Sequence, residues 1–176
     1  MTVNRGKRFE KVIEEAFMKV PGVSIDRLHD QTTGFAGSTN ICDYIVYKKP
    51  FEYYIECKSV HGNTLSIHGT DDKHRYGNIT NKQWEGLLEK SKIKGVYAGI
   101  ICWWIDKGVT KFIPIQALEF MHRNGYKSIR YDSGVPFGCE YYMIPIEGDR
   151  KRVFFDYDMD IFFYDIEKEV RRHGND

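Results

Sequence analysis

Hydrophobic side chains recur at helical spacing in several parts of the chain. In residues 6–20 they lie three and four positions apart, which predicts a helix with one apolar face that a Pro-Gly pair ends. A second helix is expected over residues 80–92, because Thr80 is a favourable N-cap and Gly95 follows the helix. Further helices are predicted over residues 116–123 and 159–172.

Strands are predicted where Tyr, Ile, Val and Phe concentrate. Residues 41–48 and 51–58 form two such runs with Lys49-Pro50 between them, so they are expected to pair as a hairpin. The remaining expected elements are strands over 96–104 and 111–113 and polar loops over 22–40 and 59–78. This order predicts an α/β fold with a mixed central β-sheet flanked by helices.

Composition narrows the class of protein. The chain has 176 residues, of which 41% are hydrophobic and 29% charged, so one globular domain over residues 1–176 is expected. No apolar run is long enough for a membrane span and the first residues lack a signal-peptide pattern, so a cytoplasmic protein is expected. None of the four cysteines forms a C-x-x-C pair, which argues against a structural zinc site and favours buried thiols. Trp84, Trp103 and Trp104 are expected in the core, and His61, His68 and His74 in solvent.

The formal net charge of +1 excludes a strongly basic coat but allows a local basic face. Basic side chains cluster at residues 5–8, 48–49 and 150–152, and each cluster alone is as well explained by solvated surface charge. The basic side chains expected to contact DNA phosphates lie partly outside these clusters. They are Arg5, Lys7, Arg8, Lys82, Lys127 and Arg130.

The predicted hairpin carries the chemically informative residues. Glu56 and Lys58 are two positions apart on a strand and so share one face, while Ile55 and Cys57 point toward the core. If the turn is centred between residues 49 and 50, positions that sum to 99 face each other. Asp43 would then lie directly opposite Glu56, with Cβ atoms roughly 5 Å apart.

Two facing carboxylates repel each other, and a divalent cation would remove that penalty. Mg²⁺ binds one or two carboxylates together with waters and phosphate oxygens, and it activates water for phosphodiester hydrolysis. Lys58 could orient that water or stabilise the transition state. The alternative for Asp43 and Glu56 is an exposed hairpin that happens to carry charges.

The same residues resemble the PD-(D/E)XK nuclease superfamily, and more specific matches resemble the RecU-type Holliday junction resolvases, including bacteriophage members. The resemblance covers residues 4 to about 132. It rests on Asn4-Arg5-Gly6 with Glu10, Asp43-Tyr44, Glu56-Cys57-Lys58, Gln83 and Lys127-Ser128-Ile129-Arg130.

The resemblance implies a restriction-endonuclease-like core and a Mg²⁺-dependent endonuclease, with Mn²⁺ as a substitute. It implies a homodimer that resolves branched DNA, the Holliday junction, by paired phosphodiester hydrolysis in recombination and repair. The compact chain favours a phage origin, without excluding a cellular one. The implied catalytic residues are Asp43, Glu56, Lys58, Gln83 and Glu10, and the implied metal site comprises Asp43, Glu56, Cys57 and Gln83.

Several alternatives stay open. Gln83 also fits a capping box with Thr80, and Glu10 also fits a solvated helix position. The family's hydroxyl residue two positions before the aspartate is Ile41 here, so that role is vacant or passes to residues 38–40. The segment between the first helix and the first strand is shorter than the family's junction-engaging stalk, which bears on strict four-way-junction selectivity more than on nuclease chemistry. The competing functions are a nuclease for flaps or duplex ends and a non-catalytic DNA-binding module. Aromatic runs at 141–143 and 153–155 could form a dimer contact or pack in the core.

Overall fold

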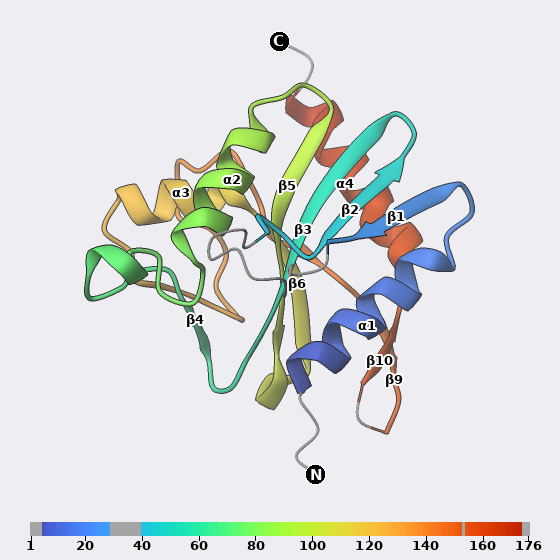
Figure 1. Cartoon of the computed structure of the whole chain (residues 1–176), viewed down its shortest axis with the longest axis horizontal. Coiled ribbons are helices and arrows are strands. Elements are labelled where there is room, and N and C mark those ends of the chain that lie inside the picture. The colour runs from blue at the N-terminus through green and yellow to red at the C-terminus, as the bar shows by residue number, and fades with distance from the viewer. Residues whose placement is uncertain (1–4, 29–39, 153, 174–176) are drawn as a thin grey trace, which may run out of the picture.

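A computed structural model describes residues 5–28, 40–152 and 154–173, with side chains up to residue 169. Its centre is a six-stranded sheet with the strand order β1-β2-β3-β5-β6-β8 (Figure 1). The parallel pair β3–β5 lies among antiparallel neighbours, so the sheet is mixed, as predicted. The strands are β1 (Val23–Arg27), β2 (Tyr44–Lys48), β3 (Phe51–Val60), β5 (Val96–Trp104), β6 (Val109–Pro114) and β8 (Ile144–Pro145).

Helices cover both faces of this sheet. Helices α1 (Arg5–Met18) and α4 (Met159–His173) pack on one face, and α2 (Asn81–Ser91) and α3 (Ile115–Arg123) pack on the other (Figure 1). The predicted α/β class with helices flanking a mixed sheet is therefore confirmed. No helix in the described ranges is both long and apolar enough to cross a membrane.

Alternation along β3 sends neighbouring side chains to opposite layers. Ile55 and Cys57 pack with α1 and α4, as predicted, whereas Tyr54 packs with α2 and α3. Glu56 shares the face of Tyr54 and is only 3% exposed, because α2 covers that face as well. The alternative expectation, in which Glu56 is a surface charge on an exposed hairpin, is thus wrong. The three tryptophans and four free cysteines are buried, as expected.

The small elements lie at the edges of the sheet. They are β4 (Thr64–Ser66) paired with β7 (Ser128–Arg130), β9 (Gly148–Arg150) paired with β10 (Phe155–Tyr157), and the 3₁₀ turns η1 (Asp72–His74) and η2 (Ile105–Lys107). Strands β1 and β4 fall in segments that were predicted as loops. For β1 the prediction missed an alternation of half-buried and exposed side chains, which is the mark of a strand with one covered face.

Candidate active site

The register of the β2–β3 hairpin places Asp43 beside β3. Paired residues sum to 99 from Lys48↔Phe51 to Tyr44↔Ile55, which is the predicted register. The ladder ends there, and the Asp43 amide donates to the Ile55 carbonyl at 3.1 Å. The Asp43 carboxylate accepts a hydrogen bond from the Cys57 amide at 2.7 Å. Asp43 therefore meets Cys57 through its side chain, and the expected ladder pair with Glu56 does not form.

Glu56 is held through one of its two carboxylate oxygens. Its Oε1 accepts a hydrogen bond from Gln83 Nε2 at 2.6 Å and lies 2.8 Å from Lys58 Nζ. Its Oε2 is buried and has no hydrogen-bond partner among the described residues. A buried carboxylate oxygen without a partner is costly, so this atom is available to an additional electropositive group.

The surroundings of Glu56 favour its protonated form. Burial is the main cause, and the negative charge of Asp43 adds to it, so the pKa of Glu56 rises from 4.5 to about 8. The Lys58 ammonium opposes this shift by charge and by hydrogen bonding. A bound cation would act in the same direction as Lys58 and favour the ionised carboxylate.

Gln83 both caps helix α2 and contacts the acidic residues. Its Oε1 accepts from the Thr80 amide at 3.1 Å, and Thr80 Oγ1 accepts from the Gln83 amide at 3.2 Å, which completes a capping box. The same Oε1 accepts from Lys58 Nζ at 3.2 Å, while Nε2 donates to Glu56. The capping and site roles of Gln83 thus coexist in one side chain, and the cap holds the amide in place.

Glu10 approaches the site from α1. Burial and the charge of Asp43 raise the pKa of Glu10, while Arg27, Lys7 and Lys58 oppose the rise. The charges of Asp43 and Lys58 therefore both affect Glu10. Its Oε2 accepts a hydrogen bond from Arg27 at 2.8 Å. This partial burial argues against the alternative of a fully solvated helix carboxylate.

Arg27 is the site neighbour that sequence reasoning missed. It comes from β1, reaches Glu10 at 2.8 Å and Glu14 at 3.7 Å, and lies over the Tyr44 ring. The alternating pattern of β1 was the signal that could have revealed it. Its contact with Glu10 depends on how α1 packs against β1, which no local pattern specifies.

The donor set suits a hard cation. Asp43 and Glu56 supply carboxylate oxygens, and Mg²⁺ needs only one or two of these because it keeps several waters. Among residues 5–28, 40–152 and 154–169, no group of three or more His, Cys, Asp or Glu side chains forms a ready-made metal cluster. A bound Mg²⁺ would relieve the repulsion from Asp43 and would give a partner to Glu56 Oε2, which has none among the described residues.

Cys57 contributes to this site through its backbone. Its thiol is buried against α1, and burial raises the pKa of Cys57 well above its ordinary value, so a thiolate ligand is disfavoured. Its amide points toward Asp43, and the carbonyl of a strand residue points to the same edge as its amide. A metal role for Cys57 therefore requires the carbonyl oxygen.

The expected DNA-contacting residues lie in three separate places. Arg5, Lys7 and Arg8 form the first turn of α1, and Lys82 is exposed in the first turn of α2. Lys127 and Arg130 lie at β7, where Arg130 forms a double hydrogen bond with Asp132. Of the residues named for the absent hydroxyl, only Asn40 is described, and residues 38 and 39 lie outside the described ranges, as does Asn4.

The expected solvent histidines are exposed. His61 contacts Asp106 at 2.9 Å and His74 contacts Asp71 at 3.0 Å, so both make surface ion pairs when protonated. His68 is exposed as well.

The sequence matches no protein-family model and no curated protein. Among solved structures, the chain is similar to Hjc of Archaeoglobus fulgidus, a Holliday junction resolvase from an archaeal hyperthermophile. The two share 16% sequence identity with a TM-score of 0.45, over 80% of this chain and 88% of that chain. A likeness at this distance is too weak to transfer an activity, so function has to follow from the residues of the site.

Proposed function

We propose that this chain is a Mg²⁺-dependent, structure-selective DNA endonuclease that resolves four-way junctions. The observation that carries the proposal is the state of Glu56. One oxygen is held by Gln83 and Lys58, and the other is buried near a second carboxylate and has no partner in the part of the chain that the structure describes. Two carboxylates and a lysine gathered on a covered sheet face suit phosphodiester hydrolysis, whereas folding alone would avoid the repulsion.

Each residue has a proposed role in this reaction. Asp43, Glu56 and the Cys57 carbonyl would hold Mg²⁺, which supplies an activated water and neutralises charge on a phosphate oxygen. Lys58 donates to the charge that develops on the phosphoryl group, and Gln83 holds Glu56 and Lys58 in register. Glu10 would position a water near Asp43.

The junction preference and the dimer extend the proposal through the family resemblance. One chain carries one such site, so nicking two strands related by a two-fold axis needs two copies. Tyr141 and Tyr142 are 40% and 52% exposed and could contribute to that contact, whereas Phe154 is buried in the core. The protein would act in recombination or repair in the bacterial cytoplasm, as a cellular or phage-encoded enzyme.

The test is cleavage of a substrate panel. Four-way, three-way, flap and linear duplexes are incubated with Mg²⁺, with Mn²⁺ and with EDTA, and Asp43→Asn serves as the matched control. Paired metal-dependent nicks in the four-way junction, absent in Asp43→Asn, are expected. Cleavage only of flaps or ends would identify the competing nuclease activity, and binding without cleavage of any substrate would identify a non-catalytic DNA-binding module. Sedimentation with and without junction DNA measures the dimer.

A further inference from the structure

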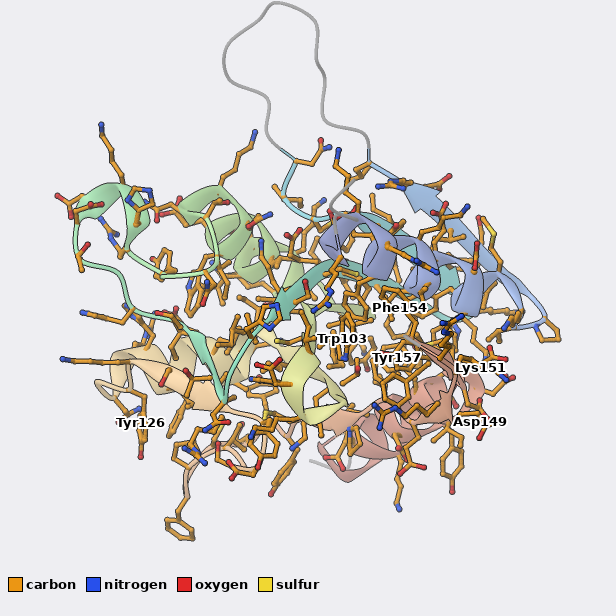
Figure 2. All side chains as sticks on the ribbon, turned by 90° about the horizontal axis from the view of Figure 1, so that it is seen from below. Trp103, Tyr126, Asp149, Lys151, Phe154 and Tyr157 are labelled. Atoms are coloured by element: carbon orange, nitrogen blue, oxygen red, sulfur yellow. The ribbon has the colours of Figure 1, made fainter. Side chains whose placement is uncertain are left out.

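A basic groove of about 580 Å³ lies between α1 and the β9–β10 hairpin, away from the carboxylates. We infer that it binds the phosphate backbone of a duplex DNA arm. The inference rests on the proposed function, since it names a second contact surface for the same substrate. Figure 2 shows Phe154 and Tyr157 between α1 and the hairpin, with Lys151 toward the outside. The basic lining residues are Arg8, Lys11, Lys19, Lys151 and Arg152.

Charge is concentrated in this groove. Five basic side chains line it against two acidic ones, Glu15 and Asp156, whereas the whole chain has a net charge of only +1. The groove thus gathers a surplus of three positive charges in a protein that is otherwise nearly balanced. Local surplus of this kind is the electrostatic pattern of a phosphate-binding surface.

The two acidic residues organise the cations. Asp156 forms ion pairs with Lys19, which directly follows α1, and with Lys151 from the hairpin, so it joins the two walls. Glu15 pairs with Lys11 at 3.7 Å along the helix. These exposed pairs are weak, and a phosphate oxygen can compete for the same ammonium groups.

The groove has an aromatic floor that holds Arg8, one of the two remaining cations. The Arg8 guanidinium lies 4.9 Å from the centre of the Phe154 ring, and Phe154 is buried against Trp103 with ring centroids 5.2 Å apart. Arg8 is thereby held at the groove although the residue remains exposed. Arg152 is exposed and has no ion-pair partner among the described residues, so its charge is available to a ligand.

The geometry favours DNA over an anionic membrane. A helix that lies on a membrane turns its apolar face outward. In α1 the centre of that face packs into the core, since Phe9, Ile13 and Phe17 are all 0% exposed. The groove has a floor of buried Phe154 and Tyr157, and its other apolar lining residues, Val12 and Phe155, are partly buried, so what it chiefly exposes to a ligand is cations.

The first turn of α1 carries residues both of the groove and of the neighbourhood of the candidate active site. Arg8 and Lys7 are neighbours in the first turn of α1, and Lys7 lies close enough to Glu10 to lower its pKa. A strand cut at Asp43 and Glu56 could therefore cross the first turn of α1 and enter the groove. Residues 150–152 contribute no side chain to the candidate active site. On this path their positive charge would contact the same DNA farther from the cut.

The test measures duplex and junction binding in EDTA, where cleavage is blocked, between about 50 and 200 mM salt. Lys151→Ala/Arg152→Ala is expected to weaken binding several-fold and to reduce the slope of log affinity against log salt by about 1 for each phosphate that is no longer neutralised. The charge-conserving Lys151→Arg/Arg152→Lys should bind as the wild type does. Lys92→Ala/Lys94→Ala is the control with equal charge loss. These residues lie in the turn between α2 and β5, near the top of Figure 1 and far from α1 and the β9–β10 hairpin at the lower right, so the slope should stay unchanged.

The inference would be overturned if the Lys151→Ala/Arg152→Ala protein had the affinity and slope of the wild type. It would also be overturned if the Lys92→Ala/Lys94→Ala control lost as much affinity and slope as the groove variant. Binding to vesicles that contain phosphatidylserine is measured for the same proteins. If the Lys151→Ala/Arg152→Ala variant binds DNA as the wild type does but no longer binds these vesicles, the inference is overturned in favour of a lipid surface. The proposed function is tested separately. If the Lys151→Ala/Arg152→Ala variant shows the reduced slope but the wild type cleaves no substrate in Mg²⁺, the groove inference stands and the nuclease proposal fails.

Discussion

The Gln83 side chain lies 2.6 Å from Glu56 through its Nε2, while its Oε1 caps helix α2 at the Thr80 amide. One amide therefore couples the start of a helix to the buried acid of the candidate site. Because the cap holds Oε1, the amide cannot rotate without losing a helix hydrogen bond. The orientation of the donor toward Glu56 is thus set by the helix terminus.

Substitution of Gln83 separates these two roles. In Gln83→Glu a carboxylate oxygen still accepts from Thr80, so the thermal midpoint should change little. The donor to Glu56 is lost and a negative charge takes its place, so the single-turnover cleavage rate should fall about 10- to 100-fold. Gln83→Ala, which removes both roles, should lower stability as well. Normal cleavage by Gln83→Glu would leave Gln83 as a cap only.

Glu56 should make the metal-free protein less stable as pH rises. Its pKa is 4.5 ordinarily and about 8 when folded, so both states are protonated at low pH. Between those values the unfolded state loses the proton and the folded state keeps it, so the free energy of unfolding falls up to about pH 8 and then levels. Each unit of this shift corresponds to about 1.4 kcal/mol.

Urea unfolding in EDTA at several pH values measures this effect. Glu56→Gln removes the titrating group and should show a flatter profile, with higher stability than the wild type above about pH 8. Glu85→Gln, at an exposed position of α2, is a control that should keep the wild-type profile. Parallel profiles for the wild type and Glu56→Gln would contradict the buried, protonated acid.

Metal binding should release a proton from Glu56. Since the carboxylate must ionise to bind a cation, Mg²⁺ affinity should increase with pH until about pH 8. Calorimetry in two buffers of different ionisation enthalpy counts the protons released at pH 7. Glu56→Gln should release none and bind Mg²⁺ weakly. Binding that is independent of pH would place the metal elsewhere.

Lys58 should act on the transition state. Lys58→Ala is expected to lower the single-turnover rate about a hundredfold with little change in DNA affinity. Because Lys58 holds the pKa of Glu56 down, its removal should also move the pH dependence of Mg²⁺ binding to higher pH. A loss expressed mainly as weaker DNA binding would instead make Lys58 a phosphate anchor.

Gly86 should be required by the packing of Ile41 on α2. A Cβ at Gly86 would lie 2.4 Å from Ile41 Cγ2, a distance that forces Ile41 to move. Gly86→Ala should therefore destabilise the protein, although alanine favours a helix by about 1 kcal/mol over glycine. The Cβ of Ile41 would also lie only 2.7 Å from the Cβ added at Gly86, so the matching variant is Ile41→Gly, which removes both clashing atoms. Gly86→Ala should cost less stability in the Ile41→Gly background than in the wild type, and thermal unfolding of the single and double variants measures the difference.

Local sequence patterns determined much of the fold. The strand over 96–104 has the predicted bounds, because a continuous apolar run suits a strand covered on both faces. The capping residues of α2 were readable because a capping box is a contact between positions three apart. The register of β2 with β3 followed from the turn alone, since a hairpin turn determines which residues pair.

Tertiary structure decided the chemistry of the site. Glu56 is buried because α2 covers its face of the sheet, and alternation along β3 cannot reveal what covers a face. Arg27 reaches Glu10 only because β1 joins the sheet beside α1, and the basic groove exists only because residues 148–157 return to the helix at the start of the chain. Sequence periodicity reports which side chains share a face, but burial, pKa and charge surplus depend on segments that meet only after folding.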